Sequence, residues 1–168
     1  MKNSKLAALV LGTGMLAFPV FAHVTLDQAT LPADSYVRVT LRVPHGCDGA
    51  ATTGVRLQVP TELRELKPMP ASGWTLTVVP GEPSAGSGGH GASVLPREIA
   101  WLGGNLPDNQ YQEFVMRVRT PAETGATLYF PVVQECEGGK VARWIERAGG
   151  SGPAPRYPAY VVRIVPKA

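Results

Sequence analysis

Short segments in which apolar and polar residues alternate one by one are the feature that most restricts how this chain folds. The run from Ser35 to Pro44, SYVRVTLRVP, has valine or leucine at every second position, with arginine and threonine between them. Residues 53–60, TGVRLQVP, repeat the pattern. Because successive side chains of a β-strand point to opposite faces, this period of two predicts strands with one buried face. No stretch longer than two turns shows the 3.6-residue period of an amphipathic helix.

Strand-like segments recur along the chain between turns rich in glycine and proline, of which the sequence has 19 and 16. Many short alternating strands in a chain of this length predict an all-β fold, an antiparallel β-sandwich of the cupredoxin or immunoglobulin-like type. Residues 62–67 and 121–124 are predicted as single helical turns. The predicted strands, about nine, span residues 23–27, 35–44, 53–60, 74–79, 98–102, 113–119, 127–134, 141–145 and 160–165.

The start of the chain has the composition of a secretory signal peptide. Lys2 and Lys5 precede an apolar stretch, and Val20 and Ala22 occupy the two positions that a signal peptidase reads. We expect cleavage after Ala22, so that residues 1–22 are removed. The remainder, 23–168, is then a single exported domain, periplasmic or secreted. Beyond the signal, no stretch is long and apolar enough to span a membrane.

Charge and motifs exclude several function classes. The formal net charge of +3 includes Lys2 and Lys5, so the mature chain carries about +1, and no basic run interleaves with aromatic residues. We therefore expect no nucleic-acid partner. The sequence has no G-x-S-x-G nucleophile motif and no phosphate-binding glycine loop that opens a helix. Residues 81–93, GEPSAGSGGHGAS, and residues 149–155 are predicted as surface loops, with His90 in solvent.

The two cysteines, Cys47 and Cys136, predict a disulfide. An exported chain enters an oxidising compartment, where paired cysteines are the usual outcome. A thiolate metal site is the alternative, but the spacing lacks the C-x-x-C pattern of such sites.

Cleavage after Ala22 would make His23 the first residue of the mature protein. Its free α-amine and its ring Nδ1 would then be able to close a chelate on one metal ion. Cu(II) favours nitrogen and oxygen ligands in a square plane, and an α-amine gives up its proton to a metal readily near neutral pH. The alternative is that a histidine follows the cleavage site by chance, and a cut one residue away would remove the chelate.

A connection near residues 30–34 would fold the first two predicted strands into a hairpin, with His23 opposite residues in the low forties. His45 and Asp48 would then lie near the mature N-terminus. Each has a purely structural alternative. His45 would be a loop residue, and Asp48 in the motif GCDG would be a turn residue, since aspartate tolerates tight turns. The cluster does not form if the two strands lie in different sheets.

The disulfide would bring Cys136 and the segment that follows it to the same end of the sandwich. That segment turns at two glycines and returns through Trp144. Trp144 is thus predicted near His23, and its structural alternative is a core packing residue.

The motifs together resemble the YcnI-like copper-binding family of exported bacterial proteins. The resemblance covers almost the whole mature chain. It implies a β-sandwich that binds Cu(II) through the N-terminal histidine, with an acidic side chain completing a one-histidine brace and a tryptophan close by. The matching stretches are AHVTL, VPHGCDGAATTGVRLQVP, the GW at Gly73-Trp74, IAWLGG, YQEF, LYFPVVQECEGG and the RW at Arg143-Trp144.

The family's site residues carry over unevenly. His23 matches the leading histidine, and Trp144 matches the tryptophan, which would limit water access or interact with the metal. Family members without cysteines place a glutamate in the loop where this chain reads HGCDG, so Asp48 is the nearest acid. His45 is the alternative ligand, because imidazole suits Cu(II) better than carboxylate does. If neither binds, the next oxygen donors in line are Glu113 and Glu135.

The resulting expectation is an exported Cu(II)-binding protein of copper trafficking or homeostasis, a metallochaperone or store and not an enzyme. Its partners would be the copper ion and membrane copper transporters or other periplasmic copper proteins. One alternative is a copper-dependent oxidative enzyme of the lytic polysaccharide monooxygenase type. Such an enzyme needs a second histidine, for which His45 is the candidate, and an aromatic substrate face, whereas aromatic residues make up only 7% of the chain. The other is a metal-free sandwich that binds a protein partner.

Overall fold

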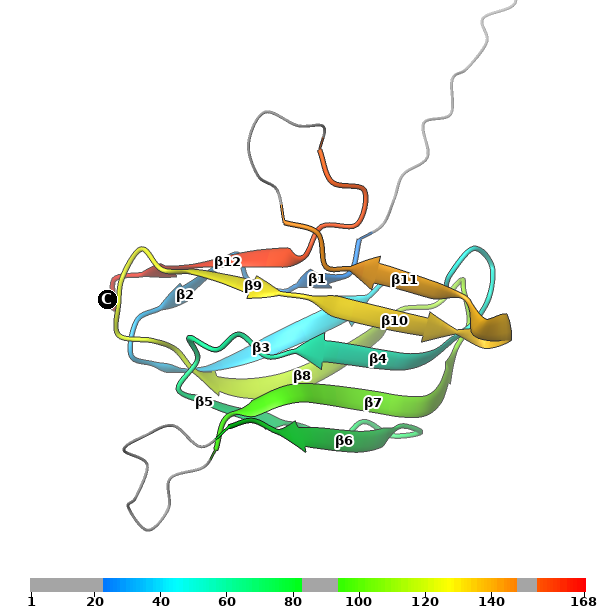
Figure 1. The fold of residues 1–168 in the computed structure, drawn as a ribbon, viewed down its shortest axis with the longest axis horizontal. Coiled ribbons are helices and arrows are strands. Elements are labelled where there is room, and N and C mark those ends of the chain that lie inside the picture. The colour runs from blue at the N-terminus through cyan, green and yellow to red at the C-terminus, as the bar shows by residue number, and fades with distance from the viewer. Residues whose placement is uncertain (1–22, 83–93, 148–153) are drawn as a thin grey trace, which may run out of the picture.

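A computed structural model describes residues 23–82, 94–147 and 154–168, and within these ranges the chain forms strands and one 3-10 turn but no α-helix (Figure 1). The predicted all-β fold is confirmed. The strands are β1 (Thr25–Leu26), β2 (Thr30–Pro32), β3 (Tyr36–Val43), β4 (Thr52–Gln58), β5 (Glu65–Pro68), β6 (Thr75–Pro80), β7 (Pro96–Leu106), β8 (Gln112–Arg119), β9 (Thr127–Phe130), β10 (Val132–Cys136), β11 (Val141–Trp144) and β12 (Tyr160–Val165), and the 3-10 turn η1 spans Glu137–Gly139.

The strands form three sheets around one core. A four-stranded sheet has the order β1-β3-β8-β5, a five-stranded sheet the order β11-β10-β4-β7-β6, and a three-stranded sheet the order β2-β12-β9. In Figure 1, β3 and β8 lie behind β4 and β7, so that the two larger sheets face each other as the layers of a sandwich. Every strand pairing is antiparallel except that of β12 with β2, which is parallel.

The alternation of β3 sets its buried face as predicted. Val39, Leu41 and Val43 are fully buried, while Arg38 and Arg42 are exposed. The fully buried side chains of β4, β7, β8, β9 and β12 close the core from the other strands. These include Val55, Leu57, Ile99, Trp101, Phe114, Met116, Val118, Leu128, Phe130 and Val162. Phe114 lies between Trp74 and Trp101, with ring centroids 5.0 and 4.9 Å away.

The prediction of one strand over residues 127–134 was wrong. Pro131 divides this run into β9 and β10, because proline lacks the N–H that a continuous ladder needs. The two halves then join different sheets. β9 pairs with β12, and β10 lies between β4 and β11. A single apolar run therefore supplies a strand to each of two sheets.

The helical turns predicted at residues 62–67 and 121–124 were also wrong. Leu63 and Leu66 are three residues apart, which mimics one face of a helix, but Leu66 belongs to β5 and points inward from a strand that pairs with β8. Residues 121–124 are irregular, with a bend at Ala122 and a turn that begins at Thr124. Within residues 30–34, the chain forms β2 rather than a plain connection, yet β1 and β3 do pair antiparallel as expected.

The predicted signal peptide, the loop that carries His90 and most of the predicted 149–155 loop lie outside the described residues. In the part of the chain that the structure describes, no helix has the length and apolar character required to cross a membrane.

Candidate functional site

His23 is placed by the pairing of β1 with β3. Thr25 lies opposite Arg42 and Leu26 opposite Leu41, so the chain before Thr25 runs toward the loop that follows β3. Val24 is 2% exposed and anchors this segment in the core. His23 itself is only half-buried. Its position near the end of β3 is the one that the hairpin argument predicted.

Trp144, the last residue of β11, forms the wall against which His23 packs. The two ring centroids are 5.3 Å apart and the ring planes are inclined by 61°, an edge-on contact. On another side the indole meets the ring of Tyr157, with centroids 5.1 Å apart. Trp144 is 3% exposed. The indole therefore serves both as a core residue and as the immediate neighbour of His23.

Gln134, in the middle of β10, fixes the Trp144 indole by a hydrogen bond. Its side-chain carbonyl Oε1 accepts a hydrogen bond of 3.2 Å from Nε1 of Trp144. Its Nε2 donates to the backbone carbonyl of His45 and to Oγ1 of Thr52, both at 2.7 Å. Gln134 is 1% exposed, so this is a buried polar network. Gln134 was not among the residues predicted from the sequence, where its one signal is an amide in the apolar run LYFPVVQ.

The loop after β3 is closed by the predicted disulfide, which is confirmed. Cys47 and Cys136 are joined, and Cys47 also exchanges both backbone hydrogen bonds with Ala50. The two residues between them, Asp48 and Gly49, have φ angles of +47° and +82°. This is the geometry of a two-residue hairpin turn of type I′, in which Asp-Gly is a favoured pair. The turn role considered for Asp48 is thus present.

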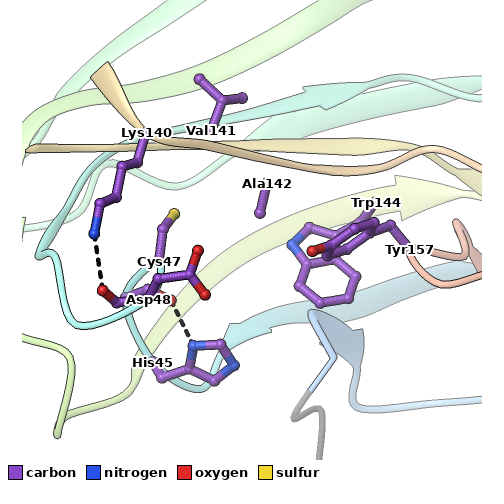
Figure 2. A pocket seen from close by; sticks show the side chains of 9 residues that line it. His45, Cys47, Asp48, Lys140, Val141, Ala142, Trp144 and Tyr157 are labelled. Carbon is purple, nitrogen blue, oxygen red and sulfur yellow. Dashed lines mark hydrogen bonds between the residues drawn. The ribbon is translucent and has the colours of Figure 1, made fainter. Parts of the chain in front are cut away.

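A pocket of about 250 Å³ lies beside this turn (Figure 2). In the figure, the His45 ring and the Asp48 carboxylate lie at one side, and the Trp144 and Tyr157 rings lie at the other. Nδ1 of His45 is within hydrogen-bond distance of the Gly46 carbonyl oxygen. The structure thus brings three predicted site residues, His45, Asp48 and Trp144, to one pocket. His23 does not line the pocket, but its ring contacts Trp144, which does.

Lys140 closes the pocket on the side of the 3-10 turn. Its Nζ donates a hydrogen bond of 2.9 Å to the backbone carbonyl of Asp48. The bond ties the Asp48–Gly49 turn to the start of β11 and leaves the Asp48 carboxylate out of that contact. The turn and the strand that carries Trp144 are therefore connected by this bond as well as by the disulfide.

The described residues contain no preformed cluster of metal-ligating side chains. No three side chains of His, Cys, Asp or Glu are grouped there in a way that holds a metal ion. Glu113 pairs with Arg42 at 3.0 Å, and Glu135 pairs with Arg56 at 2.7 Å. The hydrogen bond that Arg56 donates to the Glu135 carboxylate is the main cause that raises the pKa of Arg56. Both glutamates, named as reserve oxygen donors, are thus engaged in ion pairs.

A solved structure confirms the fold. The chain is similar to an uncharacterised protein from Nocardia farcinica with an immunoglobulin-like fold, at 26% identity and a TM-score of 0.66 over 85% of this chain and 98% of that chain. A protein from Corynebacterium diphtheriae, described as a "Putative membrane anchored protein", has 9% identity and a TM-score of 0.43 over 90% of this chain and 38% of its own. No curated protein matches the chain.

One family covers nearly the whole domain. Residues 23–164 match the family described as "Domain of unknown function (DUF1775)". The YcnI-like proteins that the sequence resembles carry this domain. The match begins at His23, the residue that packs on Trp144. The chain is therefore a member of the DUF1775 family with an immunoglobulin-like β-sandwich.

Proposed function

We propose that the mature chain is an exported protein that binds one Cu(II) ion through the α-amine and the imidazole of His23. It would act as a metallochaperone or store rather than as an enzyme. It would exchange the ion with membrane copper transporters or other periplasmic copper proteins. Copper is thus the cargo of the protein. The proposal draws on the processing pattern and the family resemblance as well as on the site.

The observation that carries the proposal is the position of His23. Its ring is packed edge-on against Trp144, and yet the residue is only half-buried. A chelating residue that delivers its metal needs such a place, since the ring must be held still while the metal remains accessible to a partner. The buried neighbour Val24 and the β1–β3 pairing fix the main chain directly behind it. After cleavage at Ala22, the new amine would belong to this fixed residue.

Asp48 is proposed as the oxygen ligand, and His45 is its competitor. Both side chains reach the pocket bounded by Trp144 (Figure 2). The short hairpin turn gives the Asp48 backbone little freedom, which favours a defined carboxylate position. Electron paramagnetic resonance of copper-loaded His45→Ala and Asp48→Ala separates the two. We expect Asp48→Ala to change the spectrum. Loss of a nitrogen coupling in His45→Ala alone would reverse the assignment.

The decisive experiment is a copper titration of the mature protein that starts at His23. We expect one tightly bound Cu(II), and loss of tight binding in His23→Ala. Adding a single glycine before His23 should be nearly as damaging, because it moves the amine away from the ring nitrogen. His90→Ala is the matched control among the three histidines of the sequence and should bind as the wild type does. Equal affinity in all four proteins would refute the proposal.

The proposal that the protein is not an enzyme is tested on the same material. The copper-loaded mature protein should not oxidise polysaccharide when peroxide is added. Turnover that depends on His23 would favour the oxidative alternative, in which His45 would be the second histidine.

A further inference from the structure

We propose that Gln134 is the positioning residue of this site. By holding the Trp144 indole against His23, it sets the surroundings of the bound copper. The inference rests on the proposed function and adds a residue that acts on the site through Trp144. The buried amide of Gln134 makes three hydrogen bonds, and the donor or acceptor character of each partner determines its orientation.

The chemistry of its partners fixes the orientation of the Gln134 amide. The indole Nε1 of Trp144 is only a donor, so the amide oxygen must face it. The backbone carbonyl of His45 is only an acceptor, so the amide nitrogen must face that group. A flipped amide would place two donors together and two acceptors together. Only one arrangement satisfies both partners, and it holds the indole in one place.

The amide also joins two parts of the site that come from distant segments. Its oxygen holds Trp144 on β11, while its nitrogen holds the carbonyl of His45 in the loop after β3. The second amide proton goes to Oγ1 of Thr52, at the start of β4. Both N–H donors of Gln134 are thereby used. A shift of Gln134 would move the indole and the His45 loop together.

The backbone of Gln134 is fixed on both sides. In the centre of β10, it lies opposite Ala142 of β11 and Val55 of β4. A side chain on such a backbone, 1% exposed and with both donors used, is a rigid support. The position also demands a neutral group. A carboxylate there would face the His45 carbonyl oxygen with no proton between them.

The alternative is that Gln134 merely fills the core and satisfies buried polar groups. Thr120 offers a matched control, since it is also fully buried in the sandwich. Its Oγ1 bonds the carbonyl of Pro32, at the end of β2, and the carbonyl and N–H of Ser35, in the turn that follows. Thr120→Val removes a comparable network away from Trp144. A purely structural role predicts the same kind of loss from both variants.

The experiment compares four forms of the mature protein: wild type, Gln134→Met, Trp144→Phe and Thr120→Val. Methionine keeps the length of glutamine and removes its hydrogen bonds. Hydrogen exchange of the Trp144 indole proton is measured without metal by nuclear magnetic resonance, and copper affinity and the paramagnetic resonance spectrum are measured with it. We expect Gln134→Met to speed the exchange at least about tenfold, to weaken copper binding about tenfold and to alter the spectrum. Thr120→Val should change none of the three.

Trp144→Phe removes the donor of the hydrogen bond between Trp144 and Gln134 and keeps an aromatic ring that contacts His23. The double variant with Gln134→Met should therefore bind copper no more weakly than Trp144→Phe alone. Additive losses, or a wild-type spectrum in Gln134→Met, would overturn the inference. Unchanged indole exchange would overturn it without any copper. Absence of copper binding by the wild type would instead mean that the proposed function fails, and the positioning of copper by Gln134 with it.

Discussion

The indole of Trp144 meets the imidazole of His23 edge-on, with the ring centroids 5.3 Å apart. This contact connects His23, at which the family domain begins, to β11, the strand that follows Cys136 of the disulfide. An edge of one aromatic ring against the face of another is a favourable arrangement. The contact fixes His23 while leaving the residue half-exposed.

Trp144→Ala should destabilise the domain and should also remove the ring contact that holds His23. The side chain is 3% exposed and packs on two rings, so its removal should lower the free energy of unfolding by about 3–5 kcal/mol. Trp144→Phe should cost clearly less, because an aromatic ring remains. Urea unfolding of both variants measures the difference, and equal losses would contradict the packing role.

Removing the disulfide should destabilise the protein strongly. The bond joins residues separated by 89 positions, for which the chain-entropy model gives about 4–5 kcal/mol. We expect the double variant Cys47→Ser/Cys136→Ser to lose a large part of this in urea unfolding. A control is the wild type treated with reductant, which should show the same loss and gain two hydrogens in intact mass. Two alkylatable thiols in the untreated protein would show that the bond does not form.

Gly46→Ala should disturb the loop that carries His45. A Cβ at position 46 would lie 1.9 Å from the backbone oxygen of Ala50, a contact that the hairpin turn is unable to accommodate. Overpacking of this kind costs about 1–3 kcal/mol. The comparison is Gly125→Ala, where the added Cβ meets no atom within 4 Å and the positive φ of 84° accounts for the cost. Thermal unfolding measures the loss of stability in both variants. In a copper titration, Gly46→Ala should bind copper more weakly than the wild type, whereas Gly125→Ala should bind copper normally.

Glu65 should make stability depend on acid pH. The hydrogen bond from Arg117 lowers the pKa of Glu65 against the opposing effect of burial, and Lys67 adds to the lowering. The folded state then holds its proton less tightly than the unfolded state. The resulting stabilisation is therefore present above the unfolded pKa and lost as the pH falls through the folded pKa.

The test is urea unfolding of Glu65→Gln at neutral pH and at acid pH. The variant should be less stable at neutral pH, by about 1 kcal/mol or less, and this difference should shrink on acidification. Glu123 is exposed in an irregular segment, and Glu123→Gln makes the same charge change and serves as the control. A difference that grows in acid would contradict the argument.

Periodicity predicted the strands that have one clean buried face and failed where another signal interfered. The alternation of residues 35–44 marked β3 to within one residue at each end. Pro131 does not interrupt the apolar pattern around it, so hydrophobicity alone did not predict the break between β9 and β10. β5 is short, and the leucine spacing of its neighbourhood resembles a helix. Such a strand exists because β8 offers an edge to pair with, which is a tertiary effect.

The site was predictable where chain connectivity determined it. A disulfide and a β1–β3 pairing were enough to bring Trp144 and the His45 loop to the end where His23 lies. Gln134 was not predictable in this way. Its role depends on which donors and acceptors face it across two strand pairings, and that follows from register rather than from residue type.

The parallel pairing of β2 with β12 has a consequence for the order in which the molecule is completed. Thr30 lies opposite Arg163, so one of the earliest strands of the domain pairs with the last. Until residue 163 has emerged, β2 has no neighbour in its sheet and β9 lacks its partner. A chain that is synthesised from its N-terminus forward therefore remains open on one side until β12 has been made. The third sheet is therefore completed only after β12 is present.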